Sequence, residues 1–289
     1  MAKLTKEDIV AFADKYLKED NYAVVYKKQG KDPNEKKMTK PEITPIVSNR
    51  DVASPFLTSI QENAVKPIEP VFLDFKKDMS QLTAKSDIPV LYKQNTTNDL
   101  FQLIYVFDMG NNNDKALGTA FDYLEYLGTS DMTPEELKSE FYRLACTFYV
   151  SPGNERTYVV LSGLNENMPA AMQLFEKLLA DAQVNKEAYD NLVGDILKAR
   201  ADAKLNQGQN FSRLMNYAMY GPKSPATNLL TEAELASMNP QELVDRIHNQ
   251  NNYKHRILYY GPSSSKDLLA TIDQYHQVPA TLKDIPAGN

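Results

Sequence analysis

The sequence has very few of the residues that build reactive or cross-linked sites. Its 289 residues include one cysteine, three histidines and no tryptophan. A single cysteine, Cys146, excludes an intrachain disulfide and any metal site made of several thiolates. It stands in the apolar stretch RLACTFYV, which indicates a buried structural thiol. His248, His255 and His276 are never four positions apart, so a zinc-binding histidine pair on one helix is excluded, and only the fold could gather all three.

The chain also lacks an excess of positive charge and long apolar runs. The formal net charge is −6 and the isoelectric point is about 5.3, which argues against a general nucleic-acid binder. We expect no membrane span, because no apolar run reaches the roughly 18 residues that one needs. The first residues, MAKLTKEDIVAF, are polar and show no signal-peptide pattern.

Two segments of the chain resemble each other. Residues 4–30 and 238–262 each combine a capping residue, an amphipathic helix, an Asn-Tyr pair and a β-rich run, AVVYK or RILYYG. Their offset of about 230 residues is a domain length. We therefore expect residues 1–30 to be the helix–strand tail of a preceding repeat, in a fragment of a longer protein. Residues 31–67, with five prolines, are expected to be an interdomain linker, and residues 68–289 one complete domain.

The remaining elements predict an α+β fold. Strands are expected at 89–95, 100–110, 147–153 and 156–164, the last two as a hairpin. Helices are expected at 113–128, 133–145, 169–182, 185–205, 211–221 and 266–276. Thr133, Pro134 and Glu136 predict a capping box at one helix start. Neighbouring strands followed by helix pairs indicate a mostly antiparallel sheet with helices packed on one face.

The stretch FDYLEYLG contains Asp122, Glu125 and Tyr126 at the spacing i, i+3 and i+4. On a helix these positions lie on one side. A His-x-x-Glu-His box uses the same spacing, with two imidazoles on zinc and a glutamate that activates water. Tyrosine is a poor zinc ligand because its hydroxyl stays protonated near neutral pH. The pattern alone therefore favours an exposed polar helix face over a metal site.

The order of elements around that stretch resembles the pitrilysin/insulinase (M16) family of zinc peptidases. The likeness rests on GTAFDYLEYLGTSDMTPEELKSEFYRLACTFYVSPGNERTYVVLSGL, and on AMYGPKSPATNLLTEAELASMNPQELVDRIHNQNNYKHRILYYG near the end. It implies that Asp122 and Tyr126 replace the metal histidines, that Glu125 matches the catalytic glutamate, and that Asp195 stands near the third ligand. The resemblance is to the box-less half of such a peptidase. It implies no cofactor and no catalysis in this chain, with zinc bound in a partner half.

The function implied by the resemblance is to enclose and bind peptide for a zinc-bearing half, in the same polypeptide or in a partner subunit. An extended peptide could add to a sheet edge at 147–164, where ordinary strand pairing is the alternative. Tyr217 and Tyr220 could line a peptide cavity, or pack between the closing helices.

Two other functions stay open at this point. One is a structural or assembly role, as in the core subunits of respiratory complex III. The other is a cryptic metallohydrolase that uses Asp122, Glu125 and a remote His or Asp. The compartment is unknown, and a periplasmic location is favoured by the resemblance if the protein is bacterial.

Overall fold

A computed structural model describes residues 4–18, 20, 22–30, 38–44, 52–70 and 72–288. The chain divides into two compact units, residues 1–69 and residues 70–289. The expected linker lies partly outside the described residues. The assignment of residues 1–30 to a preceding repeat stays a prediction.

The first unit contains two short helices. Helix α1 (Lys6–Tyr16) begins at Thr5, whose side chain and that of Asp8 form a capping box. Helix α2 (Pro55–Gln61), which was not expected, lies inside the expected linker and begins at Ser54 with a proline in its first turn. The strand expected in AVVYK does not form, since residues 22–28 take no regular structure. A β-run becomes a strand only when neighbouring strands accept its backbone hydrogen bonds.

The second unit is built on a six-stranded sheet. Its spatial order is β1-β2-β6-β3-β5-β4. Only β2 and β6 pair in parallel, and every other neighbouring pair is antiparallel, so the sheet is mostly antiparallel as predicted. The strands are β1 (Ser80–Ala84), β2 (Ile88–Gln94), β3 (Leu100–Phe107), β4 (Cys146–Pro152), β5 (Thr157–Leu164) and β6 (Arg256–Gly261).

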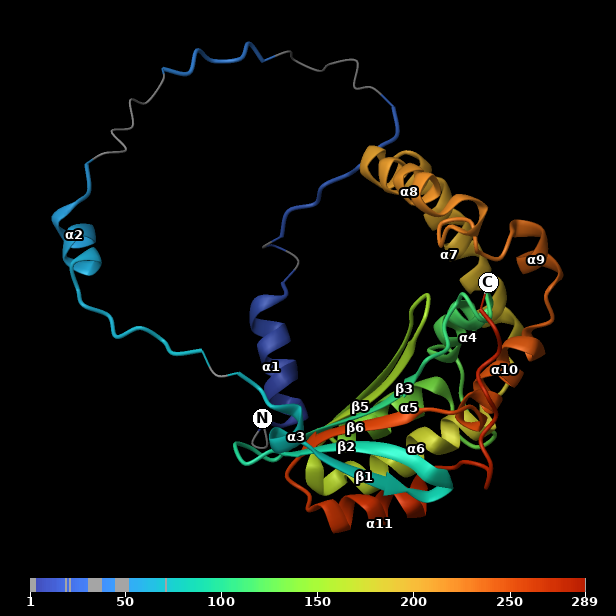
Figure 1. Cartoon of the computed structure of the whole chain (residues 1–289). Helices are drawn as coiled ribbons and strands as arrows, with labels where there is room; N and C mark the ends of the chain where they lie inside the picture. The colour runs from blue at the N-terminus through green and yellow to red at the C-terminus, as the bar shows by residue number, and fades with distance from the viewer. Residues whose placement is uncertain are drawn as a thin grey trace. The chain divides into compact units, whose positions relative to one another are not determined.

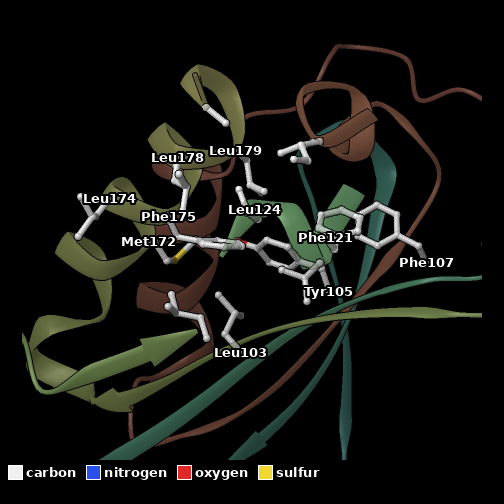
Figure 2. Packing of buried hydrophobic residues seen from close by; sticks show 14 of the residues in the cluster. Leu103, Tyr105, Phe107, Phe121, Leu124, Met172, Leu174, Phe175, Leu178 and Leu179 are labelled. Carbon is white, nitrogen blue, oxygen red and sulfur yellow. The ribbon is translucent and has the colours of Figure 1, made fainter. Parts of the chain in front are cut away.

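Alternation along the strands decides which sheet face is covered. In β3, Leu103, Tyr105 and Phe107 are buried in the main core, and Figure 2 shows their side chains next to those of the helices. Phe121 and Phe175 approach them from α4 and α6. The intervening strand residues point to the opposite face, because successive side chains alternate. The core therefore lies between the sheet and one helical layer, which confirms the α+β arrangement.

The helices of this unit follow the expected order (Figure 1). Helix α5 begins at the predicted capping box of Thr133 and Glu136. Sequence analysis missed the short helices α3 and α9. The helices are α3 (Phe75–Asp78), α4 (Leu117–Leu124), α5 (Pro134–Arg143), α6 (Met168–Asp181), α7 (Lys186–Lys204), α8 (Gln207–Tyr220), α9 (Glu232–Ser237), α10 (Pro240–Asn249) and α11 (Ser265–Tyr275). Among the described helices, none has the length and apolar character needed to cross a membrane.

Helices α7 and α8 project as a pair from the sheet and its helical layer (Figure 1). Only Tyr189 and Leu192 of α7 are buried, and both belong to its first half. Helix α8 has no buried residue, although it carries several apolar side chains. A helix with exposed apolar residues usually marks a surface that contacts another molecule or domain.

Candidate functional site

The residues that resemble a zinc box stand at the end of a helix. Helix α4 ends at Leu124, so Asp122 is helical, Glu125 caps the C-terminus and Tyr126 lies beyond it. The chain continues in a tighter turn, with Tyr126 N–H bonded to Tyr123 O at 3.0 Å and Leu127 N–H to Leu124 O at 3.1 Å. Helix α4 is therefore shorter than the helix expected over 113–128. Because Glu125 and Tyr126 lie at or beyond its end, the three residues do not all lie on one side of a regular helix.

The surroundings of Asp122 weaken it as a metal ligand. Desolvation and, second, the Glu125 carboxylate raise the pKa of Asp122 above its ordinary value. A carboxyl group that retains its proton to higher pH is a weaker metal ligand. Throughout the described ranges, no three His, Cys, Asp or Glu side chains are grouped so as to hold a metal ion. Asp122, Glu125 and Tyr126 lack both imidazoles and do not fit zinc.

The match of Asp195 to the third ligand stays a prediction. Asp195 is on α7, and it lines a shallow depression together with Tyr126, although the two are far apart in the sequence. Glu125 lines a different depression, and Lys138 of α5 borders both. Glu125, Tyr126 and Asp195 thus border two depressions that share Lys138, and among the described residues they form no metal-ligand set.

Strand β4 is an edge of the sheet, because it pairs only with β5. Gly153 N–H bonds to Arg156 O, and Leu164 N–H bonds to Ala145 O. In the same register, odd-numbered residues of β4 direct their backbone groups to β5, since antiparallel ladders alternate. The N–H and C=O groups of Cys146, Phe148 and Val150 therefore face the open edge. The backbone of Pro152 also faces the open edge, so the N–H group that proline lacks is not needed for a hydrogen bond to β5.

An apolar groove of about 620 Å³ runs beside this edge. Phe141 and Phe148 meet in it with ring centroids 4.8 Å apart, and Phe148 also packs on Phe175 at 4.9 Å. Tyr142 stands at its border and is 81% exposed. Cys146 lines the groove but is buried as expected, and burial raises the pKa of its thiol. The groove offers an apolar surface next to unpaired backbone groups.

A row of apolar side chains crosses the sheet face opposite the core. The strand register aligns one residue from each of five neighbouring strands. Each member of the row stands between two residues that face the helices, so it points to the other face. From the edge inward, the row consists of Tyr149, Val160, Ile104, Leu258 and Leu91.

The two candidate tyrosines on α8 are both exposed, and the structure gives no support for packing between closing helices. Tyr220 lines a hollow of about 860 Å³ together with Tyr158 and Arg156 at the β4–β5 turn. Tyr217 does not line this hollow. The structure therefore brings Tyr220, but not Tyr217, to a concave surface near the edge strand.

The histidines, which sequence analysis could not place, enter a buried network. His255 and His276 contact each other, and His276 contacts Glu176 of α6. His248 instead bonds to Ala182 O at 3.1 Å. Because the histidines already have these partners and lie apart from Asp122 and Glu125, the described residues do not favour the cryptic metallohydrolase. No periodic sequence signal joins positions so far apart.

Comparisons by sequence found nothing: no family model matches the chain, and no curated protein does. Solved structures do match. The periplasmic protease PqqL from Escherichia coli matches 99% of this chain at a TM-score of 0.64 and 15% identity. The inactive peptidase M16 domain from Pseudomonas fluorescens matches 73% of this chain at a TM-score of 0.62 and 16% identity. The ferredoxin protease FusC matches 78% of this chain at a TM-score of 0.60 and 13% identity.

The chain has the fold of peptidase M16 domains, as the sequence resemblance implied. It spans 29% of the matched PqqL chain, 54% of the Pseudomonas fluorescens chain and 27% of the FusC chain. Identities of 13–16% support the fold, while substrate and activity need an argument from the chain's own residues.

Proposed function

We propose that this chain is a non-catalytic pitrilysin-like domain that binds an extended peptide along the open edge of β4. The observation that carries the proposal is the outward direction of the Phe148 and Val150 backbone groups beside an apolar groove. A peptide strand added there gains main-chain hydrogen bonds from the edge and apolar contacts from the groove. The altered box supports binding without cleavage.

We further propose that the peptide is enclosed between this domain and a zinc-bearing half. The exposed Tyr149 at the edge of the apolar row and the unburied helix α8 supply surface for such an enclosure. The short span of the chain within its structural neighbours agrees with a missing half. In this proposal residues 4–28 belong to that other half, whose sheet their helix–strand pattern would complete.

A proline substitution tests the edge. Val150→Pro removes one outward N–H and leaves the bonds to β5 intact, as Pro152 already does. We expect the affinity for a fluorescein-labelled ten-residue peptide with alternating apolar residues to fall at least about tenfold, measured by fluorescence anisotropy. The thermal unfolding midpoint should change little.

Tyr149→Pro is the matched control, because position 149 donates inward to β5 and its loss should destabilise the domain. Tyr142→Ala should weaken the same peptide without affecting folding, since the ring is exposed at the groove border. If Val150→Pro binds the peptide as tightly as the unaltered chain does, the edge proposal is wrong. A purely structural role would be supported if no peptide binds this chain and if a zinc-bearing half, when added to it, shows no peptidase activity.

A further inference from the structure

A fully buried carboxylate organises the network between the sheet, α6 and the C-terminal segment. Glu176 is 1% exposed and is surrounded by donors. Tyr105 Oη–H donates to its Oε1 at 3.1 Å, Asn251 Nδ2–H to its Oε2 at 2.9 Å and Gln277 N–H to the same oxygen at 3.1 Å. A buried carboxyl group with several donors has its charge compensated locally.

Two imidazoles continue the network from Glu176 to a backbone carbonyl. His276 Nδ1 lies 2.7 Å from Glu176 Oε1, and His276 Nε2 lies 2.8 Å from His255 Nε2. His255 Nδ1 lies 2.7 Å from Tyr253 O. Each distance is that of a hydrogen bond. The series of three bonds ends at Glu176 Oε1 on one side and at Tyr253 O on the other. The carbonyl oxygen can only accept a hydrogen bond, and the carboxylate oxygen also accepts when Glu176 is ionised.

The number of protons in the series follows from its geometry. Each of the three bonds needs one proton, whereas two neutral imidazoles carry only two. The third proton makes one imidazole cationic beside an ionised Glu176, or it resides on the carboxyl oxygen and is shared with His276. In both arrangements the three side chains have no net charge, which suits a site without solvent. Loss of the proton would place two acceptors face to face, and a fourth proton would place two donors face to face.

We propose that Glu176, His276 and His255 form a proton-binding site that holds one proton in the folded chain and fastens the C-terminal segment, residues 276–285, to the domain within a limited range of pH. The segment begins in the network through His276 and Gln277. Farther along, Lys283 N–H bonds to Asn252 O at 2.7 Å, and Lys254 N–H bonds to Lys283 O at 2.9 Å.

The surrounding groups favour this single-proton state. The Phe107 ring packs on His255 with centroids 4.6 Å apart, and the Tyr105 ring packs on His276 at 4.3 Å. Burial first, and the charge of His276 second, lower the pKa of His255 to about 4. Burial raises the pKa of Tyr105, which therefore stays a donor.

Other titratable groups around the network come from every neighbouring element. His248 of α10 borders the hollow beside Glu176. The Asp273 carboxylate of α11 accepts from the backbone N–H of Lys85 at 2.9 Å, and Lys254 forms an ion pair with Asp284 at 2.5 Å. The phenol of Tyr253 also lies nearby. Asp273, Lys254 and Asp284 already have these partners at the surface, so they do not supply the proton that the buried series needs.

The direction of the pH dependence follows from the proton count. In an unfolded chain, histidine titrates near pH ~6.5 and glutamate near pH ~4.3, so the three groups bind on average about one proton at pH ~6.5. Above that pH the folded chain binds more protons, and stability falls as the pH rises. Below it the unfolded chain binds more, and stability falls as the pH falls. The contribution of this site should therefore be greatest near pH ~6.5.

Imidazole nitrogen spectra of the full chain test the proton count directly, because only three histidines are present. At pH 7 we expect Nδ1 of His255 and both nitrogens of His276 to show coupled or shared protons. The resonances of these two residues should not move between pH 5.5 and 7.5. His248→Gln assigns the remaining imidazole and should leave the other two unchanged. Two neutral imidazoles that titrate independently near their ordinary pKa would overturn the proposal.

Unfolding and exchange measurements test its consequence. Between pH 7.5 and 8.5 the unfolding equilibrium constant should rise up to about tenfold per pH unit, as one released proton requires. This dependence should be lost in His276→Gln but kept in His248→Gln. From pH 6.5 to 4.5, amide exchange at Gln277 and Lys283 should increase about tenfold after correction for intrinsic rates. Unchanged protection would contradict the fastening role, and peptide affinity is not part of either readout.

Discussion

The two helix–strand segments of this chain have similar sequences and different surroundings. In the later segment, Leu243 and Ile247 of α10 are fully buried against the core, and β6 lies between two other strands. In the earlier segment, Ile9 of α1 is 63% exposed and Val25 is 90% exposed. Both sequences form the helix, because capping residues and amphipathic spacing act locally. Only the later one forms the strand, because a strand depends on neighbours.

Truncation of matched helix positions should separate the two segments most strongly. Leu243→Ala removes a buried side chain and should cost about 2–5 kcal/mol of unfolding free energy, measured by urea denaturation. Ile9→Ala occupies the corresponding place in α1 and should cost less than about 0.5 kcal/mol, since its side chain is exposed. Equal losses would mean that α1 is packed in solution. Adding the proposed other half should raise the cost of Ile9→Ala alone.

Acidification should give the second-largest difference between the two segments, because it should lower the stability of the later one. It contains His255, whose pKa is lowered to about 4, whereas residues 4–28 contain no histidine. The unfolded chain takes up the proton first, so stability falls as the pH falls from about 6.5 to about 4, by about 3 kcal/mol. Urea denaturation at several pH values measures this loss.

His255→Gln provides the control for the acid limb. Its amide can still donate to Tyr253 O and accept from His276, yet it does not titrate. The pH dependence should therefore be smaller in this variant. A loss of the same size in both chains would assign the effect to other groups.

Substitution of the helix-capping residues should give the smallest difference in stability between the two segments. Asn239 accepts from Gln241 N–H at 3.1 Å, and Asn239→Ala should cost about 1 kcal/mol in global unfolding. Thr5 accepts from Asp8 N–H at 3.2 Å, and Thr5→Ala should lower the helicity of α1 by circular dichroism without changing the global transition. A global effect of Thr5→Ala would contradict a purely local role for this cap.

The sequence was sufficient for elements whose pattern matches their burial. Strand β3 was predicted because apolar residues run through LFQLIYVF, and α5 because Thr133 and Glu136 form a capping box. Strand β1 was missed, since Leu82 is flanked by polar residues in a strand exposed along most of its length. The early end of α4 was also missed, because apolar residues continue through Leu127.

Tertiary contacts explain what the patterns could not. At Gly128 a side chain would lie 2.3 Å from Met132 O, so the backbone must turn closely there and α4 cannot continue. The candidate site also depends on tertiary contacts that local sequence patterns do not reveal. The depression that Asp195 shares with Tyr126 follows from helix packing, and the outward groups of Phe148 and Val150 follow from strand pairing, neither of which a single sequence specifies. The buried histidines contact a glutamate far away along the chain, which no spacing rule predicts.

The position of β6 affects when this domain can fold. It joins β1 and β2 to β3, β5 and β4, yet it comes from residues 256–261, after all the other strands of this sheet in the sequence. Until it emerges from the ribosome, the nascent chain holds two sheet fragments, each with an unpaired edge. Such edges are exposed to aggregation, and pairing between distant segments slows folding. Translation arrest before residue 256 should therefore leave the chain protease-sensitive, with resistance gained only after the last strand is released.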